Sequence, residues 1–455
     1  MINNSLLEKY NTPTPRYTSY PPANYFHSDF TETNYREAIE RSNGDDALLS
    51  FYIHLPFCRH LCYYCGCNSF PMANNAFVEK YMEALYREIE LIVPLLNSRR
   101  KIAQIHYGGG SPTAIPVYHL KKIKELLLSK FDKIENPEIA IECHPGYLDE
   151  KGWEELRNAG FTRFSIGIQD FHEDVLKTVN RRPSILPAEQ IVPFLQEAGA
   201  AVNLDFIYGL PGQTVDRFRE NMDRAAQISP DRIVTFSYAH VPWINKLQLQ
   251  LEKAGLPDPA LKEQLYDTAR EILSSHNYKA LGLDHFVRHD DELMHALHKG
   301  LLHRNFQGYC TKRTTGQVYA FGVSGISQLS DAYIQNSKDP KQYIEMIGKG
   351  RLPVVKGYTL TSREKMIRTA IDVLMCNASI DWAQVAADLC CPVEELHENV
   401  LFDMERLEQF RKDGILEYSD SHISVKEEHT VFLRNVAALF DPLQTTQPRS
   451  FSKPL

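Results

Sequence analysis

The segment "SFYIHLPFCRHLCYYCGC" at residues 50–67 joins an apolar run to four cysteines. The run "SFYIHLPF" has the length and the aromatic and β-branched content of a buried strand. The cysteines follow at once in the spacing CxxxCxxCxC, and they are four of the nine cysteines in 455 residues. The segment therefore predicts a strand whose carboxyl end carries a cluster of thiols.

Further apolar, β-rich runs follow, and amphipathic segments such as "AFVEKYMEALYREIELIVPLL" separate the runs from one another. These runs are residues 102–110, 138–145, 163–171, 201–211 and 232–242. Strands that alternate with helices indicate a parallel sheet with helical crossovers. We predict an α/β fold with a partial or full parallel (β/α) barrel, and a doubly wound open sheet is the alternative. Both folds place their sites where the strands end.

The pattern changes beyond about residue 330, where helical segments precede "ILEYSDSHISV", which reads as a hairpin. Helices followed by a hairpin indicate a mainly helical, winged-helix-like domain and raise DNA binding as a function. Residues 361–429, however, contain 7 Lys and Arg against 15 Asp and Glu. Such a surface repels phosphate, so we interpret this domain as a cap or scaffold.

We divide the chain into four parts: an N-terminal arm at 1–45, a catalytic barrel at 46–330, a linker region at 331–360 and a capping domain at 361–455. The net charge is −8, which gives no overall attraction to nucleic acid. No apolar run approaches the roughly 18 residues of a membrane span. The start "MINNSLLEKY" lacks the features of a secretory signal. We expect a cytoplasmic monomer that binds neither nucleic acid nor membrane.

The clustered thiols favour an iron–sulfur cluster over two alternatives. Disulfides are rare in a reducing cytoplasm. Zinc sites usually add a second, distant pair of ligands, and no second CxxC pair follows. A compact iron–sulfur core can take thiolates from adjacent turns of one loop. Three cysteines at CxxxCxxC leave one iron of a [4Fe–4S] cluster open to bind a substrate or cofactor.

CxxxCxxC after the first strand resembles the radical S-adenosylmethionine (SAM) enzymes. Further segments extend the likeness along the chain: "PRYTSYPPA" (15–23), "HYGGGSPT" (106–113), "NLDFIYGLPGQT" (203–214), "GLDHFVR" (282–288) and "LHRNFQGY" (302–309). Together these motifs resemble the oxygen-independent coproporphyrinogen III oxidases nearly end to end. The resemblance implies a barrel of the radical SAM type.

The resemblance assigns Cys58, Cys62 and Cys65 to a [4Fe–4S] cluster whose open iron takes SAM. It places Tyr52 and Cys67 near the cofactor and substrate as catalytic candidates. It implies further cofactor-binding residues, which are Tyr64, Gly109, Gly110, Thr113, Glu142, Gln169, Arg181 and Asp205. The chain departs from the family pattern at "ECHPG", where His144 stands in place of an expected acidic residue.

The family binds a second SAM, and the resemblance places Gly209, Ala239, Phe306 and Gln307 around it. The implied substrate is coproporphyrinogen III, whose four propionates require cations, and Arg16, Arg288 and Arg304 are the candidates. The implied reaction uses a 5′-deoxyadenosyl radical to remove hydrogen from a propionate, which then loses CO₂ and one electron to leave a vinyl group. Two such steps give protoporphyrinogen IX in haem biosynthesis.

We expect the partner to be a low-potential electron donor such as flavodoxin or ferredoxin. Two alternative functions share the cysteine motif: a haem-binding chaperone, and a radical SAM methyltransferase or haem-degrading relative that acts on a tetrapyrrole. Cys67 and the "PRYTSYPP" arm favour the oxidase over the chaperone.

Overall fold

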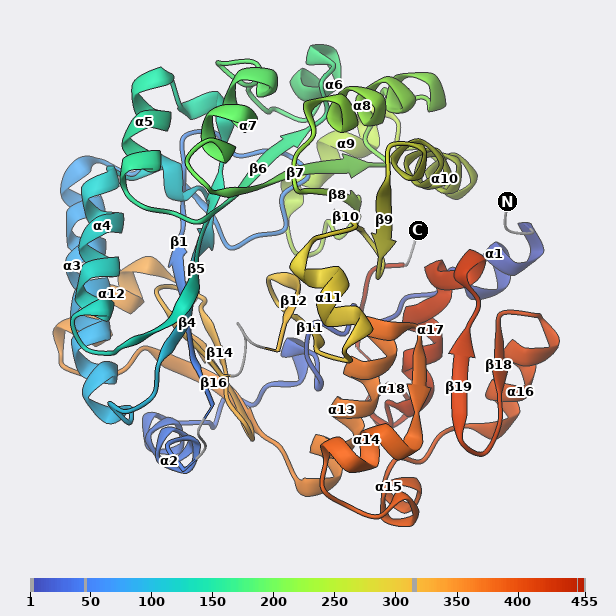
Figure 1. The fold of residues 1–455 in the computed structure, drawn as a ribbon. Helices are drawn as coiled ribbons and strands as arrows, with labels where there is room; N and C mark the ends of the chain where they lie inside the picture. The colour runs from blue at the N-terminus through green and yellow to red at the C-terminus, as the bar shows by residue number, and fades with distance from the viewer. Residues whose placement is uncertain (1–3, 45–46, 313–316, 448, 454–455) are drawn as a thin grey trace.

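A computed structural model describes residues 4–44, 47–312, 317–447 and 449–453. Its main feature is a 12-stranded sheet with the order β16-β15-β14-β13-β1-β4-β5-β6-β7-β8-β10-β9 (Figure 1). The strands are β1 (Leu49–Leu55), β4 (Ile102–Gly109), β5 (Lys133–Cys143), β6 (Arg163–Gln169), β7 (Ala201–Tyr208), β8 (Arg232–Ser237), β9 (Tyr278–Leu281), β10 (His285–Arg288), β13 (Gln317–Phe321), β14 (Ile326–Gln328), β15 (Ala332–Asn336) and β16 (Val354–Thr359).

The six strands predicted from the sequence are β1 and β4 to β8, and all six pairings from β13 through β8 are parallel. The strands of this series follow one another in chain order from β1 to β8. A doubly wound sheet would reverse that order part of the way along, so the barrel prediction is confirmed and the alternative is excluded. Antiparallel strands extend the barrel at both edges.

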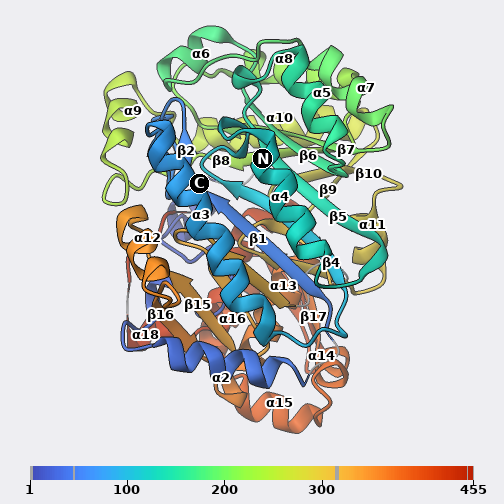
Figure 2. The ribbon, with the colours of Figure 1, turned by 90° about the vertical axis from the view of Figure 1, so that its left-hand side faces the viewer.

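Helices cover the outer face of the sheet, and Figure 2 shows α3 and α4 lying along β1. They are α3 (Asn75–Ile92), α4 (Val117–Leu128), α5 (Glu150–Asn158), α6 (Glu173–Thr178), α7 (Ala188–Gln196), α8 (Val215–Ile228) and α10 (Pro259–Ser275). Asn74 caps α3 through Phe77 N, and the apolar stripe that includes Val78, Tyr81 and Leu85 is buried in the main core. The helical period of this stripe is what allowed the helix to be predicted.

Several short strands and helices lie in the connections between the main strands and after them. These are β2 (Phe57–Cys58), β3 (Phe70–Pro71), α9 (Leu249–Ala254), α11 (Glu292–His298), and the hairpin of β11 (Leu302–Asn305) and β12 (Gly308–Thr311). Among the described residues, no helix combines the length and apolar character that a membrane crossing needs.

The C-terminal part contains the predicted helices and hairpin. Its elements are α13 (Ser362–Asn377), β17 (Ser379–Asp381), α14 (Trp382–Asp388), α15 (Val393–Asn399), α16 (Met404–Lys412), β18 (Leu416–Tyr418), β19 (His422–Val425), α17 (Leu433–Ala437) and α18 (Leu443–Thr446). The three strands form a separate antiparallel sheet, and Trp382 lies in a separate hydrophobic core. The order of helix, strand, helices and hairpin fits the winged-helix-like prediction.

The N-terminal arm crosses the molecule between these two cores. Its first helix, α1 (Asn4–Tyr10), contacts the C-terminal part, where Tyr10 stacks on Phe410 at 4.7 Å. Its second helix, α2 (Glu32–Ser42), lies near the β16 edge of the main sheet, and His27 bridges to Gly357 there (Figure 1). The domain boundaries that we placed at residues 1, 45, 46 and 455 fall outside the described residues.

Residues 331–360, for which we expected a linker, instead form β15, β16 and α12 (Pro340–Gly348). Ile334, Tyr343 and Ile347 are buried in the main hydrophobic core, so this segment is part of that core. The polar turn between β15 and α12 hid a five-residue strand that is too short to give a clear periodic pattern.

A buried carboxylate joins this edge of the sheet to α3. Glu88 accepts hydrogen bonds from Gly322 N at 2.7 Å, Asn336 Nδ2 at 2.6 Å and the Tyr343 hydroxyl at 2.6 Å. Burial raises the pKa of Glu88 from 4.5 to about 7, although the three donors oppose this shift. The folded protein therefore favours the protonated form, whose stabilising effect is present below about pH 4.5 and is lost as the pH rises toward 7.

We predict that Glu88→Gln will remove this pH dependence, because an amide does not ionise. The free energy of unfolding of the variant, relative to the wild type, should rise by about 3 kcal/mol between about pH 4.5 and 7.5. Urea unfolding over this range measures it, with the exposed Glu90→Gln as the control. A difference that stays constant with pH would contradict the assignment.

Candidate functional site

The cysteine loop begins at the carboxyl end of β1 and is tied to the barrel through its backbone. Phe70 N donates to Pro56 O at 2.7 Å, and Met72 N donates to Cys58 O at 2.8 Å. All four cysteines of the loop are free thiols. Cys62 is buried, whereas Cys67 is exposed. The loop therefore presents thiols from a fixed backbone at the edge where the parallel strands end.

Side chains from the segments that follow α6 and β8 hold the loop by its carbonyl groups. Asn245 Nδ2 donates to Cys65 O at 2.8 Å, and Gln248 Nε2 donates to Tyr64 O at 2.9 Å. Asn180 Nδ2 donates to Leu61 O at 2.8 Å. Sequence reasoning missed these three amides, since a bond to a backbone carbonyl leaves no motif in the sequence. Their effect is to fix the spacing of the thiols without engaging the sulfur atoms.

Arg181 brings a positive charge to the thiols. Its Nη1 lies 3.5 Å from Cys62 Sγ and donates to the Tyr64 hydroxyl at 3.0 Å, while its Nη2 donates to Gly167 O. A guanidinium beside a sulfur stabilises the thiolate, which is the form that binds a metal. A hydrogen bond with Cys67 is the main cause that lowers the pKa of Cys65.

The donor set fits an iron–sulfur cluster. In the described part of the chain, no three His, Cys, Asp or Glu side chains are close enough together to hold a single metal ion. An iron–sulfur cluster, in contrast, takes each thiolate at a separate iron, so its ligands need not converge on one point. Cys58, Cys62 and Cys65 are three free thiols on one loop beside a cation, which matches that requirement.

The glycine segment at the end of β4 packs directly against this loop. Gly110 N donates to Leu55 O at 2.8 Å, and a Cβ at Gly110 would lie 2.7 Å from the carbonyl carbon of Pro56. Gly109 has φ of +114°, and a Cβ there would lie 2.8 Å from the His54 ring. Thr113 Oγ1 accepts from His144 N at 3.3 Å. Positions 109 and 110 therefore require glycine, because a Cβ at either one would clash with the end of β1.

Glu142 lies at the end of β5 beside the glycines. Its Oε1 contacts His106 Nε2 at 3.0 Å, and its Oε2 accepts from Gly109 N at 3.3 Å. On β1, which lies beyond β4 in the sheet, the Tyr52 hydroxyl contacts His54 Nδ1 at 3.1 Å. The carboxylate, with a side chain that is 42% exposed, remains available to a cationic group.

Gln169 and Asp205 extend the arrangement along the next two strands. Gln169 has φ of +70°, and a Cβ at Gly167 would lie 2.5 Å from Gln169 Nε2 and 2.8 Å from Arg181 Nη2. Asp205 accepts a hydrogen bond from Ser165, and burial raises its pKa to about 6. Glu142 and Gln169 lie at the ends of β5 and β6, as expected from the sequence, whereas Asp205 lies within β7 and Arg181 follows α6. The charges of Glu142 and Arg181 both act on Asp205, so these groups lie near one another. Their cofactor-binding role stays a prediction.

A cavity of about 380 Å³ lies beside the loop and brings distant segments together. Tyr52, Cys67 and Glu142 line it, and so do Phe306 and Gln307 at the turn of the β11–β12 hairpin. Both polar atoms of the Gln307 side chain are buried without a hydrogen-bond partner among the described residues. A buried amide without partners is unfavourable, so this cavity is suited to a polar ligand.

Gly209 and Ala239 lie at the ends of β7 and β8 and are not among the residues that line this cavity. Gly209 has φ of +87°, and its backbone packs on Lys262. Ala239 O accepts from Gln248 Nε2 at 3.3 Å, so this residue supports the amide that holds the cysteine loop.

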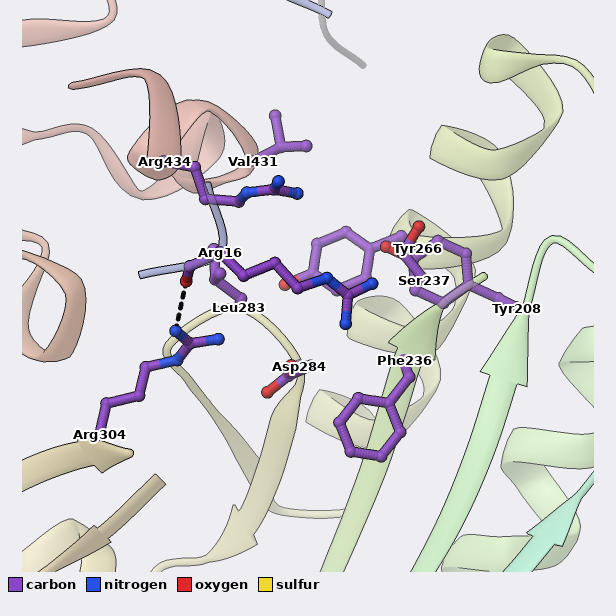
Figure 3. A pocket seen from close by; sticks show the side chains of 10 residues that line it. All are labelled: Arg16, Tyr208, Phe236, Ser237, Tyr266, Leu283, Asp284, Arg304, Val431 and Arg434. Atoms are coloured by element: carbon purple, nitrogen blue, oxygen red, sulfur yellow. Dashed lines mark hydrogen bonds between the residues drawn. The ribbon is translucent and has the colours of Figure 1, made fainter. Parts of the chain in front are cut away.

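The three predicted substrate arginines separate into two groups. Arg16 and Arg304 line one small cavity (Figure 3), and Arg304 Nη1 donates to Arg16 O at 2.5 Å. Arg288, in contrast, is exposed and bonds to Ser229 Oγ at 2.5 Å. It ends β10, which runs antiparallel to β8, so it lies at the opposite end of the sheet from the cysteine loop. The structure therefore does not place Arg288 in the site.

Known proteins are similar to this chain in both sequence and fold. The family model of the radical SAM superfamily matches residues 52–225. The chain is 35% identical over 438 residues to the oxygen-independent coproporphyrinogen III oxidase of Synechocystis sp., covering 96% of this chain and 94% of that one. It is 36% identical over 454 residues to the same enzyme of Escherichia coli, covering 99% and 97%. A solved structure of coproporphyrinogen III oxidase from Escherichia coli, described as a radical SAM enzyme, matches with a TM-score of 0.85 at 32% identity, covering 97% and 99%.

We predict that Gln248→Leu will weaken the cysteine loop without touching a thiol. Gln248 is 1% exposed, and its Oε1 also accepts from Val241 N at 2.6 Å. Loss of these bonds should reduce iron retention after reconstitution severalfold and lower the free energy of unfolding by about 1–3 kcal/mol. The exposed Gln250→Leu on α9 is the control. Equal iron retention in the two variants would contradict a supporting role for Gln248.

Proposed function

The chain belongs to the family of oxygen-independent coproporphyrinogen III oxidases, which are radical SAM enzymes, and we propose that it converts two propionates of coproporphyrinogen III to vinyl groups. The product is protoporphyrinogen IX, in haem biosynthesis. The observation that carries this proposal is the 380 Å³ cavity, where Cys67 of the cysteine loop meets the Phe306–Gln307 turn. Residues some 240 positions apart in the sequence thus face one ligand space next to the proposed cluster.

We propose that Cys58, Cys62 and Cys65 hold a [4Fe–4S] cluster and that SAM binds beside it. When bound, these two groups supply the one-electron reduction and the 5′-deoxyadenosyl radical that removes hydrogen from the substrate. Each propionate radical then loses CO₂ and passes one electron to a one-electron acceptor, which leaves the double bond of the vinyl group. The electron that starts each cycle comes from a low-potential donor such as flavodoxin or ferredoxin.

The protein's own residues bind and orient SAM in this proposal. The Glu142 carboxylate lies next to Gly109, where it can accept hydrogen bonds from an ammonium group. Gly110 and Thr113 shape the backbone of the same glycine segment, while Gln169 and Asp205 lie on β6 and β7 and Arg181 follows α6. Arg181 also holds Tyr64, which covers the Cys62 side of the loop.

We further propose that the cavity takes a second SAM or part of the tetrapyrrole at the Phe306–Gln307 turn. The unpartnered Gln307 amide supports this, and so do the unpartnered Oε1 atoms of Gln328 and Gln335, which line the same cavity. Phe306 is 39% exposed and provides an apolar surface for a ring. Gly209 and Ala239 do not line this cavity, and we propose that they support the site through their contacts with Lys262 and Gln248. Tyr52 and Cys67 face the same space as the catalytic candidates.

The reaction provides a direct test. Reconstituted protein, incubated without oxygen with coproporphyrinogen III, SAM and a strong reductant, should give a product that has lost two CO₂ and four hydrogens by mass analysis. Cys62→Ala should lose both the iron–sulfur absorbance and SAM cleavage, because one iron loses its ligand. Cys390→Ala, which changes an exposed cysteine of the C-terminal part, is the control. An active and fully coloured Cys62→Ala protein would refute the cluster assignment.

Gln307→Ala tests the cavity separately from the cluster. Because the amide has no partner among the described residues, its removal should leave the free energy of unfolding unchanged or raise it by about 1 kcal/mol. Iron content should also be unchanged, while porphyrinogen turnover should fall at least about tenfold, because a ligand contact worth about 1.4 kcal/mol or more is lost. Turnover, iron and unfolding are measured on one preparation, with the exposed Gln250→Ala beside it. Undiminished turnover would leave Gln307 with a packing role alone.

A further inference from the structure

A second, smaller cavity of about 60 Å³ lies where three parts of the chain meet (Figure 3). Arg16 reaches it from the N-terminal arm, Arg304 from β11 and Arg434 from α17. Its floor is formed by the carboxyl ends of β7 and β8, at Tyr208 and Ser237. The cavity therefore opens at the same edge of the barrel as the cysteine loop.

The side chains that line this cavity carry an excess of positive charge. Asp284 is the one carboxylate among the described lining residues, opposite three guanidinium groups. Asp284 already has a partner, since its Oδ1 contacts His285 Nδ1 at 2.6 Å. Like charges so close together repel one another unless an anion joins them.

Two of the arginines keep unused donors. The described residues provide no hydrogen-bond partner for the Arg16 guanidinium, which points into the cavity (Figure 3). Arg304 is 7% exposed, and its Nε is buried without a partner among these residues. Unpaired guanidinium donors facing one space form a binding site for a carboxylate, which accepts two parallel hydrogen bonds.

The acidities of nearby cations agree with this excess charge. Arg16 as a whole residue is exposed, but its guanidinium lies in the cavity, where desolvation and the Arg304 charge lower its pKa. Burial, Arg16 and Arg304 lower the pKa of Arg434 to about 9. Lys262, which donates to Tyr238 O at 3.0 Å, has its pKa lowered to about 7 by burial and then by Arg16 and Arg434. A bound anion would oppose each of these shifts.

Arg434, unlike Arg16, uses its guanidinium to hold the backbone of the N-terminal arm. Its Nε donates to Pro15 O at 3.0 Å, and its Nη2 donates to Thr14 O and to Ser452 O, the latter at 3.1 Å. It therefore fixes the backbone just before Arg16. This makes Arg434 a positioning residue, because it aims the arm so that Arg16 enters the cavity.

We propose that this cavity is a carboxylate subsite that holds one propionate of the tetrapyrrole substrate, with Arg16 and Arg304 as the binding groups and Arg434 positioning the arm. The volume suits a carboxylate group or a few water molecules, and it is too small for a macrocycle. Arg304 precedes the Phe306–Gln307 turn on the same hairpin, so a substrate anchored here extends toward the larger cavity. The subsite rests on the proposed function, because it takes that reaction's substrate.

Binding of an acid and of its ester tests the subsite. Reconstituted holoenzyme is titrated with coproporphyrin III, the air-stable tetracarboxylate, and with its tetramethyl ester, and fluorescence reports the dissociation constants. Wild type should prefer the acid. Arg16→Met should weaken acid binding about 10- to 100-fold and leave ester binding unchanged, because only the acid carries the charge. Arg16→Lys should retain part of the preference, since it keeps the charge but loses the paired donors.

Two further variants complete the experiment. Arg434→Lys should reduce the acid preference while making the arm more sensitive to limited proteolysis. Arg87→Met, at an exposed position on α3 paired with Glu90, is the matched control and should bind as the wild type does. SAM cleavage with reductant alone should be the same in Arg87→Met as in the wild type.

The outcomes separate this inference from the proposed function. If wild type releases no CO₂ from coproporphyrinogen III, the proposed function fails. If wild type converts this substrate but Arg16→Met keeps the full preference for the acid over the ester, the subsite is wrong and the function stands. Loss of the preference in Arg16→Met, with normal iron content and thermal stability, supports the subsite.

Discussion

The parallel strands of this protein all end at one edge of the sheet, and every feature of the proposed site depends on that alignment. A parallel strand order that follows the chain brings the loop after β1, the glycines after β4 and the polar residues of β5 to β7 side by side. No single segment contains the site. Each strand end contributes one or two groups, and the sheet hydrogen bonds set the distances between them.

The cysteine loop illustrates how such an edge holds a reactive segment. Tyr63 and Tyr64 of the loop pack against a hydrophobic cluster, and residues that follow β8 hold the loop through its carbonyl groups. Asn245 and Gln248 do so with neutral amides, which fix the backbone and leave the sulfurs free. Arg181 adds the charge that suits thiolates. The residues that hold the loop backbone thus differ from the residue that brings charge to the thiols. A substitution at Asn245 or Gln248 need not remove the charge of Arg181.

The arginine cavity depends on a different kind of contact, between parts of the chain with separate cores. The arm, the barrel and the C-terminal part meet there, and each contributes one guanidinium. Arginines that face one another do not stabilise an interface by themselves. Arg434 compensates through bonds to backbone carbonyls, whereas Arg16 and Arg304 keep donors for a ligand. The C-terminal part therefore has a defined role in holding the arm, whereas its acidic sequence argued against binding DNA and indicated only a cap or scaffold.

The sequence alone determined the six strands, the helices between them and the position of the thiols, because period, length and spacing are local properties of a chain. It also determined the family, through motifs such as "HRNFQGY". Only the tertiary structure decided that residues 331–360 complete the sheet, since a five-residue strand next to a polar turn has no distinctive pattern. It also decided which arginines meet. Arg288 ends a strand, as several of the predicted site residues do, but β10 is antiparallel to β8 and places Arg288 at the opposite end of the sheet. Arg434 lines the same cavity as Arg16, although more than 400 residues separate them in the sequence. Strand direction and long-range packing depend on the whole chain, so no local stretch of sequence records them.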